Sequence, residues 1–347
     1  MTEDLIKKSG WLVVGIKILK PGLFTTVQDK GRFGYQHLGF SGSGAMDQFS
    51  YNLGRKLIGN SGPSLEFTII GPTLTFTQAN TFVITGGQFN AKLNDINISN
   101  NNVLLANKGD VLEFGPAIKG ARGYIFFGHP LDIEMVAGSY STHTRSKIGG
   151  FNGRALKKDD HIQVVQNSNF KVNLGKTSDY DAIEQDNIIH IIEGPQVNAF
   201  SHEKRKTLVE SVYKISDQSD RMGYRLIGDN IPPDNGADII SEPVGLGSIQ
   251  VPNDGNPIIL LNDKQTVGGY TKIATVSQLD LKKLAQFKPG DVIQFKWISV
   301  DEANAMLKNF NQQFEEKLES VTKAPIFNMH SMRATSKKLA KLIEEEK

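Results

Sequence analysis

Short apolar runs punctuated by glycine and proline fill most of the chain up to about residue 300. Val, Ile, Leu and Phe alternate with polar residues in many of these runs, which is the pattern of half-buried β-strands. The expected strands lie at residues 17–19, 65–70, 73–77, 81–85, 111–114, 124–127, 188–192, 249–251, 258–261, 273–276 and 292–295. Helical patterns are few by comparison, so the sequence predicts a mainly β fold.

Two short helices are expected inside this β-rich region. Residues 47–58 show helical apolar spacing, begin at Asp47, a good N-cap residue, and end at Gly59. Residues 278–287 show a similar spacing after Ser277, which is a plausible N-cap. Both helices are short, and they do not change the mainly β prediction.

A different pattern begins at Asp301. A helical apolar stripe is formed by Ala303, Met306, Leu307, Phe310, Phe314, Leu318 and Val321. The charged segment at 337–347 carries Leu339, Leu342 and Ile343 on one side. Two interpretations stay open: a helix that docks on the body and is followed by a frayed tail, or a helix that binds a partner.

The length and the punctuation favour two domains. We expect a first domain at 16–165, a polar and aperiodic linker at 166–187, a second domain at 188–300 and a helical C-terminal extension at 301–347. Residues 108–114 and 288–295 resemble each other, each with an acidic turn before an alternating strand. Two similar barrels would produce this likeness, and so would shared turn chemistry alone.

Composition narrows the function classes. The formal net charge is +2, with basic and acidic residues mixed, which gives no bulk electrostatic case for nucleic acid or membrane partners. The chain has no cysteine, which excludes disulfides and thiolate chemistry. No apolar run reaches membrane-spanning length, and the run at 11–14 is too short for a signal peptide. We therefore expect a cytoplasmic protein.

Three polar clusters interrupt the strand pattern. The first runs from residue 25 to 47 and alternates glycines with the candidate binding or catalytic residues Gln28, Asp29, Arg32, Tyr35, Ser43 and Asp47. Glycines let a backbone approach a ligand closely, while polar side chains orient it. The alternative is structural, since aspartate and serine satisfy turns and an Asp–Arg pair can brace a loop.

The second cluster, at 216–225, contains the candidates Gln218, Asp220, Arg221 and Arg225. Arginine suits carboxylate or phosphate recognition, whereas an Asp220–Arg221 or Asp217–Arg225 pair would be structural. The third cluster begins at residue 240 and contains Glu242 and Gln250. Glu242 precedes a proline and must be extended; it is a candidate general base or, alternatively, part of a surface salt bridge.

The third cluster continues into a dense polar segment after the expected strand at 258–261. This segment places Asp263, Gln265, Thr266, Tyr270 and Lys272 around a Gly-Gly pair. Buried strands do not need so many hydrogen-bonding side chains at a turn, so the segment predicts one wall of a binding site. The seven histidines show no metal-ligand spacing, and we predict no metal site on this chain.

These clusters resemble the biotin-dependent carboxyltransferase subdomain A/B family, which includes the C subunit of 5-oxoprolinase, KipA, allophanate hydrolase subunit 2-like proteins and the carboxyltransferase region of urea carboxylase. The motifs that carry the resemblance lie at 20–32, 43–47, 65–66 with 71–72, 218–225, 241–243, 247–252 and 263–273. The resemblance covers roughly residues 16–300.

The resemblance implies two cyclophilin-like β-barrel domains that share a cleft. It also implies two partner proteins, one KipI-like and one of the LamB/YcsF type, with which the chain would form an ATP-dependent 5-oxoprolinase that converts 5-oxoproline to glutamate. ATP with Mg²⁺ would act at the level of the complex. The ligand class shared by the family is a small amide, lactam or urea.

Two alternatives stay open under the same resemblance. In one, the chain is a carboxyltransferase component for a urea-like acceptor; since the sequence has no biotinyl-lysine motif, biotin would be supplied on a separate carrier. In the other, the chain is a non-catalytic, KipA-like protein that antagonises a KipI-type inhibitor.

For catalysis, Asp29, Asp220, Glu242 and Asp263 are candidate bases and Lys272 a candidate cation.

Overall fold

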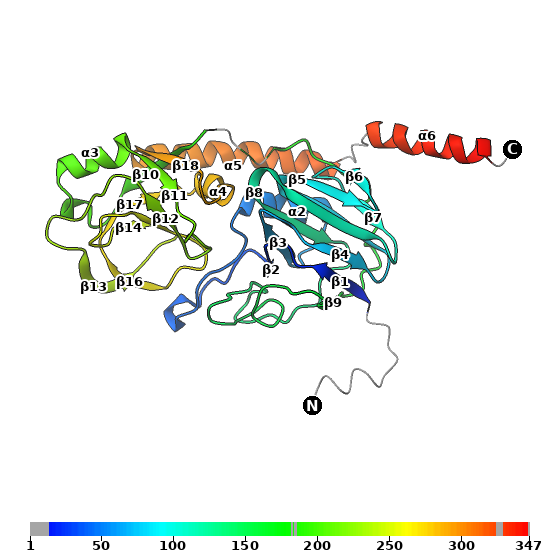
Figure 1. Cartoon of the computed structure of the whole chain (residues 1–347), viewed down its shortest axis with the longest axis horizontal. Coiled ribbons are helices and arrows are strands. Elements are labelled where there is room, and N and C mark those ends of the chain that lie inside the picture. Colours follow the sequence, from blue (N-terminus) through cyan, green and yellow to red (C-terminus); the bar gives the residue numbers. More distant parts are fainter. Residues whose placement is uncertain (1–13, 182, 184–185, 324–328, 346–347) are drawn as a thin grey trace, which may run out of the picture.

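The computed structural model describes residues 14–181, 183, 186–323 and 329–345. Two β-sheets lie side by side, with a long helix running along both of them (Figure 1). The fold class, mainly β, is confirmed. No helix in the described ranges is long and apolar enough to cross a membrane.

The first sheet has nine strands, in the order β2-β3-β8-β4-β1-β9, with β5 pairing β6, β7 and β8. Its strands are β1 Gly15–Lys20, β2 Phe24–Gln28, β3 Ser64–Thr68, β4 Thr73–Phe76, β5 Asn80–Leu93, β6 Ile96–Ile98, β7 Leu104–Ala106, β8 Val111–Phe127 and β9 His161–Gln163. β5 and β8 are long partners whose register shifts between Gly86 and Ala91. Bulges of this kind bend a sheet, and they let the strands continue through glycines.

The second sheet is a closed barrel in the order β10-β17-β14-β15-β12-β11-β18. Its strands are β10 Ile188–Glu193, β11 Val212–Ile215, β12 Gly223–Ile227, β14 Ser248–Gln250, β15 Ile258–Leu260, β17 Lys272–Val276 and β18 Val292–Trp297. A separate two-stranded sheet pairs β13 Asp238–Pro243 with β16 Val267–Tyr270. Figure 1 shows this small sheet at the outer side of the barrel.

The helices are η1 Gln36–Leu38, α2 Gln48–Ile58, η2 Val197–Ala199, α3 His202–Glu210, α4 Leu281–Ala285, α5 Val300–Lys323 and α6 Met329–Glu345. The expected helix at 47–58 is confirmed as α2, with Asp47 as N-cap and Gly59 in the left-handed region as C-cap. The helix expected at 278–287 is shorter, and its N-cap is Asp280 rather than Ser277. Ser277 instead donates its hydroxyl to Asp280.

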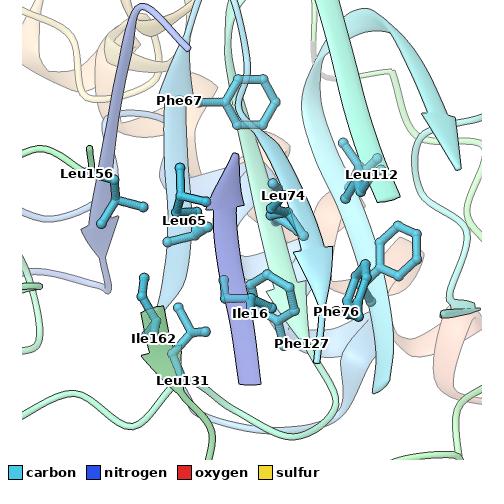
Figure 2. Packing of buried hydrophobic residues seen from close by; sticks show 14 of the residues in the cluster. Ile16, Leu65, Phe67, Leu74, Phe76, Leu112, Phe127, Leu131, Leu156 and Ile162 are labelled. Carbon is cyan, nitrogen blue, oxygen red and sulfur yellow. The ribbon is translucent and has the colours of Figure 1, made fainter. Parts of the chain in front are cut away.

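Each sheet surrounds its own apolar core. In the first sheet, side chains from β1, β3, β4 and β8 converge with Leu131, Leu156 and Ile162 (Figure 2). The barrel core is filled by side chains such as Ile191, Ile249 and Phe295. Met46, from the loop before α2, is buried in the barrel core, so the first part of the chain contributes to the packing of the second.

A third apolar cluster joins α2 and α5 to the outer face of the first sheet. Phe314, Leu318 and Val321 of α5 are buried against residues of α2, β5 and β8. The helical stripe predicted from Asp301 is therefore a docking helix. Leu339, Leu342 and Ile343 of α6 are exposed, and the partner-binding interpretation of that segment stays a prediction.

The segment predicted as a linker at 166–187 follows the first sheet closely over its first part. The Val103 N–H donates to the Lys176 carbonyl at 2.9 Å, and the Asn173 amide donates to the Ile58 carbonyl at 3.0 Å. These bonds tie residues 173–176 to the end of α2 and to the residue before β7. The domain boundaries themselves stay predictions.

Candidate active site between the two sheets

Arg221, in the turn between β11 and β12, lies at the centre of the contact between the sheets. Its guanidinium donates to both oxygens of Asp263 at 3.0 Å and to the Gly44 carbonyl at 2.7 Å. It also donates to Glu66, on β3 of the first sheet. All three charged side chains are buried. Burial alone would lower the pKa of Arg221, but Asp263 and Glu66 raise it by more.

The polar segment around Asp263, which was predicted as one wall of a binding site, therefore faces the first polar cluster. The Ser43 N–H donates to the Asn262 carbonyl at 2.9 Å, and the Ser41 hydroxyl donates to the Lys264 carbonyl at 2.7 Å. His143, from the long loop after β8, lies 3.2 Å from the Asp263 carbonyl through Nε2. The Ser146 N–H donates to its other ring nitrogen, so Nε2 carries the proton.

A cavity of about 350 Å³ opens above this network, between the two sheets. Of the predicted site residues, Asp220, Arg221 and Asp263 line it. The other charged residues of its lining are Arg122, Arg145, Asp217 and Lys288, and His143 lines it as well. The volume is in the range of small-molecule pockets, and the mixture of apolar and charged walls suits a small polar ligand.

The cations of this cavity differ in how far they are already paired. Arg122 is buried and donates through Nη1 to the Tyr224 hydroxyl and the Ala285 carbonyl, but its Nε finds no acceptor among the described residues. Lys288 pairs with Asp291 at 3.0 Å. Arg145 is exposed and has no ion pair within the described residues. Arg145 is therefore the cation of this cavity that is open to an anionic ligand group, while the charge of Arg122 lies buried beside it.

A second polar group lies beneath the small β13–β16 sheet. The buried Lys272 ammonium lies 2.7 Å from Glu242, and the Gln196 amide donates to the same carboxylate at 2.8 Å. These two contacts lower the pKa of Glu242. Glu242 is partly exposed and forms the salt bridge that was its alternative interpretation, and its role as a general base stays a prediction.

Gln250 and Gln265 bring further amides to this region. A side chain at Gly268 would approach the Gln250 Nε2 to 2.6 Å and the Gln265 Nε2 to 3.5 Å, so both amides converge on this glycine. The Gln250 Nε2 is buried and finds no acceptor in the described part of the chain. Burial lowers the pKa of the neighbouring Lys264. An unpaired amide donor beside a glycine is a feature that a carbonyl ligand could use.

Thr266 and Tyr270 belong to the same segment. The Thr266 backbone carbonyl accepts the Val244 N–H at 3.1 Å. This bond continues the pairing of β13 and β16 by one residue on each strand. Tyr270 is on β16 and is exposed, and its carbonyl accepts from the Lys272 ammonium at 3.4 Å.

The first cluster mostly braces loops. Asp29 accepts from the Gly31 and Tyr140 N–H groups and from the Ser139 and Ser141 hydroxyls. Arg32 is buried and donates to the carbonyls of Val136 and Ser141. Gln28 donates to the Thr142 carbonyl and accepts from the Gly44 N–H. These bonds hold the 136–142 loop against the 28–44 loop.

Asp47, Ser43 and Tyr35 have separate roles. Asp47 caps α2 and accepts from Gln286 at 2.9 Å, across the contact between the sheets. Burial raises the pKa of Asp47. Ser43 has a positive φ of 50°, and its buried hydroxyl finds no partner among the described residues. Tyr35 is exposed beside Phe40.

Gln218 and Arg225 are exposed and do not line the cavity. Neither structural pair considered for this cluster forms in the described residues, since Arg221 pairs with Asp263 and Glu66. Sequence reasoning missed several residues of this region as site candidates, among them Glu66, Arg122, Arg145, Gln196 and Asp217. Glu66 lies in one of the motifs and in the expected strand at 65–70. A charged residue inside a buried strand was the signal that could have marked it as a site residue.

Comparisons with known proteins agree with this architecture. A family model described as the carboxyltransferase domain, subdomain A and B, matches residues 38–297. The chain is 32% identical over 303 residues to the C subunit of 5-oxoprolinase from Escherichia coli (strain K12), and the match covers 87% of this chain and 97% of that protein.

Solved structures show the same fold. A crystal structure of TTHA0988 matches with a TM-score of 0.74 and 33% identity over 82% of this chain, and the chain spans about half of that protein, 55%. The K. lactis urea amidolyase structure matches with a TM-score of 0.80 and 27% identity over 93% of this chain, which corresponds to 21% of that protein. The chain therefore belongs to the carboxyltransferase domain family that comprises subdomains A and B.

Proposed function

We propose that this chain is the C subunit of an ATP-dependent 5-oxoprolinase complex that hydrolyses the lactam of 5-oxoproline to give glutamate. The observation that carries the proposal is the end-to-end match to the 5-oxoprolinase C subunit of Escherichia coli, which covers 97% of that protein. The partners would be a KipI-like protein and a LamB/YcsF-type protein. ATP with Mg²⁺ enters the proposal at the level of the complex.

The chemistry of the lactam fits groups that the site contains. 5-Oxoproline carries a carboxylate and an amide, and the amide is a poor electrophile. Phosphorylation of its carbonyl oxygen by ATP, with release of ADP, would activate the ring carbon toward water. Attack by water and cleavage of the ring C–N bond would free the amine and leave an acyl phosphate, which a second water would hydrolyse to glutamate and inorganic phosphate. The reaction needs a cation for the carboxylate and donors for the charge that develops on the carbonyl oxygen.

In this proposal, Arg145 binds the substrate carboxylate in the cavity between the sheets, and the buried positive charge of Arg122 in the cavity wall supports it. Arginine is suited to this role, since its planar guanidinium donates to carboxylates in a fixed geometry. Asp217 and Asp220 are exposed carboxylates at the same cavity and are the candidate bases there. Arg221 and Asp263 hold the cavity floor together, because their charges are already paired with each other.

A second candidate function has its own support. The K. lactis urea amidolyase structure covers 93% of this chain with a TM-score of 0.80. Under this alternative the chain transfers a carboxyl group from carboxybiotin on a separate carrier to a urea-like acceptor. The amides around Gly268 would then hydrogen-bond the ureido group.

Reconstitution separates the two candidates. The full chain is mixed with the KipI-like and LamB/YcsF-type proteins from the same source, and glutamate formation from 5-oxoproline and ATP is measured with each component omitted in turn. We expect glutamate only when all three are present. A well-folded complex that forms no glutamate, or one that works equally well without this chain, overturns the proposal. Carboxylation of urea that depends on a biotinylated carrier would support the alternative.

A further inference from the structure

A second groove, of about 680 Å³, lies on the far side of α2 and shares no lining residue with the cavity between the sheets. Four cationic side chains line it, Lys30, Arg55, Lys56 and Lys176, against the single carboxylate of Glu315. Within the described residues the structure records no ion pair for any of these four cations. The groove is therefore a concentrated positive surface on a chain whose net charge is only +2.

The cations come from three separate segments that are fixed against one another. Arg55 and Lys56 are in the last turn of α2. Lys30 is tied to the start of α2, because the Gln48 amide donates to its carbonyl at 3.1 Å. The Lys176 N–H donates to the Asn173 carbonyl at 3.0 Å, and the Asn173 amide reaches the end of α2.

Helix stabilisation explains only part of this arrangement. Cations in the last turn of a helix interact favourably with its dipole, which accounts for Arg55 and Lys56. It does not account for Lys30 and Lys176, which approach from other segments. The Nε of Arg55 is buried and finds no acceptor among the described residues, so the guanidinium of this lining residue is not fully paired within the chain.

The far wall of the groove is formed by Glu315 and Leu318 of α5. This helix lies beyond residue 297, where the match to the family model ends. Figure 1 shows α5 crossing over α2 along the first sheet. The groove thus depends on an element outside the matched family region.

We propose that this groove binds a small anion with several phosphate groups, such as pyrophosphate or the phosphate chain of a nucleotide. Phosphate oxygens accept strong, charge-assisted hydrogen bonds from arginine and lysine. Several cations around a hollow of this volume suit a compact ligand with several negative charges. The inference is independent of the reaction carried out between the two sheets.

Calorimetric titration of the full chain tests the proposal, with inorganic pyrophosphate and with ATP as probes and without added metal. We expect saturable binding that weakens as salt is added, because exposed charges are screened. Lys176→Gln and Arg55→Gln should each weaken pyrophosphate binding by about tenfold or more. Lys92→Gln, at an exposed lysine of β5 outside the groove, should leave it unchanged.

Arg55 also lies over the Tyr51 ring, at 5.9 Å from its centroid, so its variant could be less stable. Thermal melts show whether Arg55→Gln is destabilised. If it is, the pyrophosphate affinities of Lys176→Gln and Lys56→Gln test the proposal in its place. Equal affinities for the wild type, the groove variants and Lys92→Gln overturn the proposal. So does an absence of binding at millimolar pyrophosphate. Binding of a polyglutamate peptide without binding of pyrophosphate also overturns it, in favour of an acidic protein partner.

Discussion

Removing Arg221 tests the central structural element of the site. In Arg221→Met the buried carboxylates of Asp263 and Glu66 lose their shared cation, although Glu66 keeps the Met46 N–H at 2.8 Å. The Gly44 carbonyl also loses its donor. Breaking a buried ion pair by removing one partner costs about 3–5 kcal/mol, because an uncompensated charge stays buried. We therefore expect a loss of about 3–5 kcal/mol in the free energy of unfolding.

The assay is urea denaturation of the isolated chain, followed by far-UV circular dichroism and by intrinsic fluorescence. Arg225→Met is the matched control, since Arg225 lies on β12 only four positions away but is exposed. Its expected cost is within about 0.5 kcal/mol. In the double variant with Glu66→Gln, part of the cost should return, because one of the stranded charges is removed.

Arg221→Met would refute the reasoning if it cost less than about 1 kcal/mol, or no more than Arg225→Met. The contact between the sheets would then be held by apolar packing, for example by Met46 in the barrel core, and not by the ionic network. A separation of the two spectroscopic transitions in the variant alone would show that the sheets had become independent folding units.

Three further predictions follow from the polar contacts. Lys272→Met should reduce activity of the reconstituted complex by about tenfold or more, since it leaves Glu242 without its cation; unchanged activity contradicts this role. The pKa of Glu242 is lowered in the folded state, so the ionised side chain stabilises the fold above its unfolded pKa. That contribution is lost as the pH falls through the lower, folded-state pKa. In Glu242→Gln the free energy of unfolding should therefore change less with pH in that acidic range, as denaturation at several pH values would show. Asp47→Ala should cost about 2–4 kcal/mol by removing the α2 cap and a partner of Gln286, while Asp47→Asn should cost less than half as much in the same denaturation assay.

Local signals account for what the sequence predicted well. Alternation within five or six residues located the strands, and Asp47 and Gly59 marked both ends of α2. The runs at 111–114 and 124–127 belong to one strand, β8, because long-range pairing with β5 carries the chain through the intervening Gly and Pro residues. Four strands that lie in the polar clusters were not predicted, because the apolar alternation is weak there: β2, β12, β13 and β16.

The candidate site was harder to predict because its contacts are long-range. Arg221 was recognised, but its partner Glu66 lies 155 positions away, and no local pattern links the two. Asp29 is an aspartate among glycines and polar residues, as a catalytic carboxylate often is. Its hydrogen bonds from Ser139 and Tyr140 show that it instead supports a loop. Residue type and glycine spacing cannot separate these two uses of a carboxylate, since both need converging donors.

The measurement that tests the account most directly is the KM for 5-oxoproline of the reconstituted complex with Arg145→Gln in this chain. Arg145 lines the cavity between the sheets and has no ion pair in the described residues, whereas Arg225 is exposed and lies outside the cavity lining. We predict that Arg145→Gln raises KM by about tenfold or more and that Arg225→Gln does not change it. Equal KM values for the two variants and the wild type would contradict the assignment of this cavity as the substrate site.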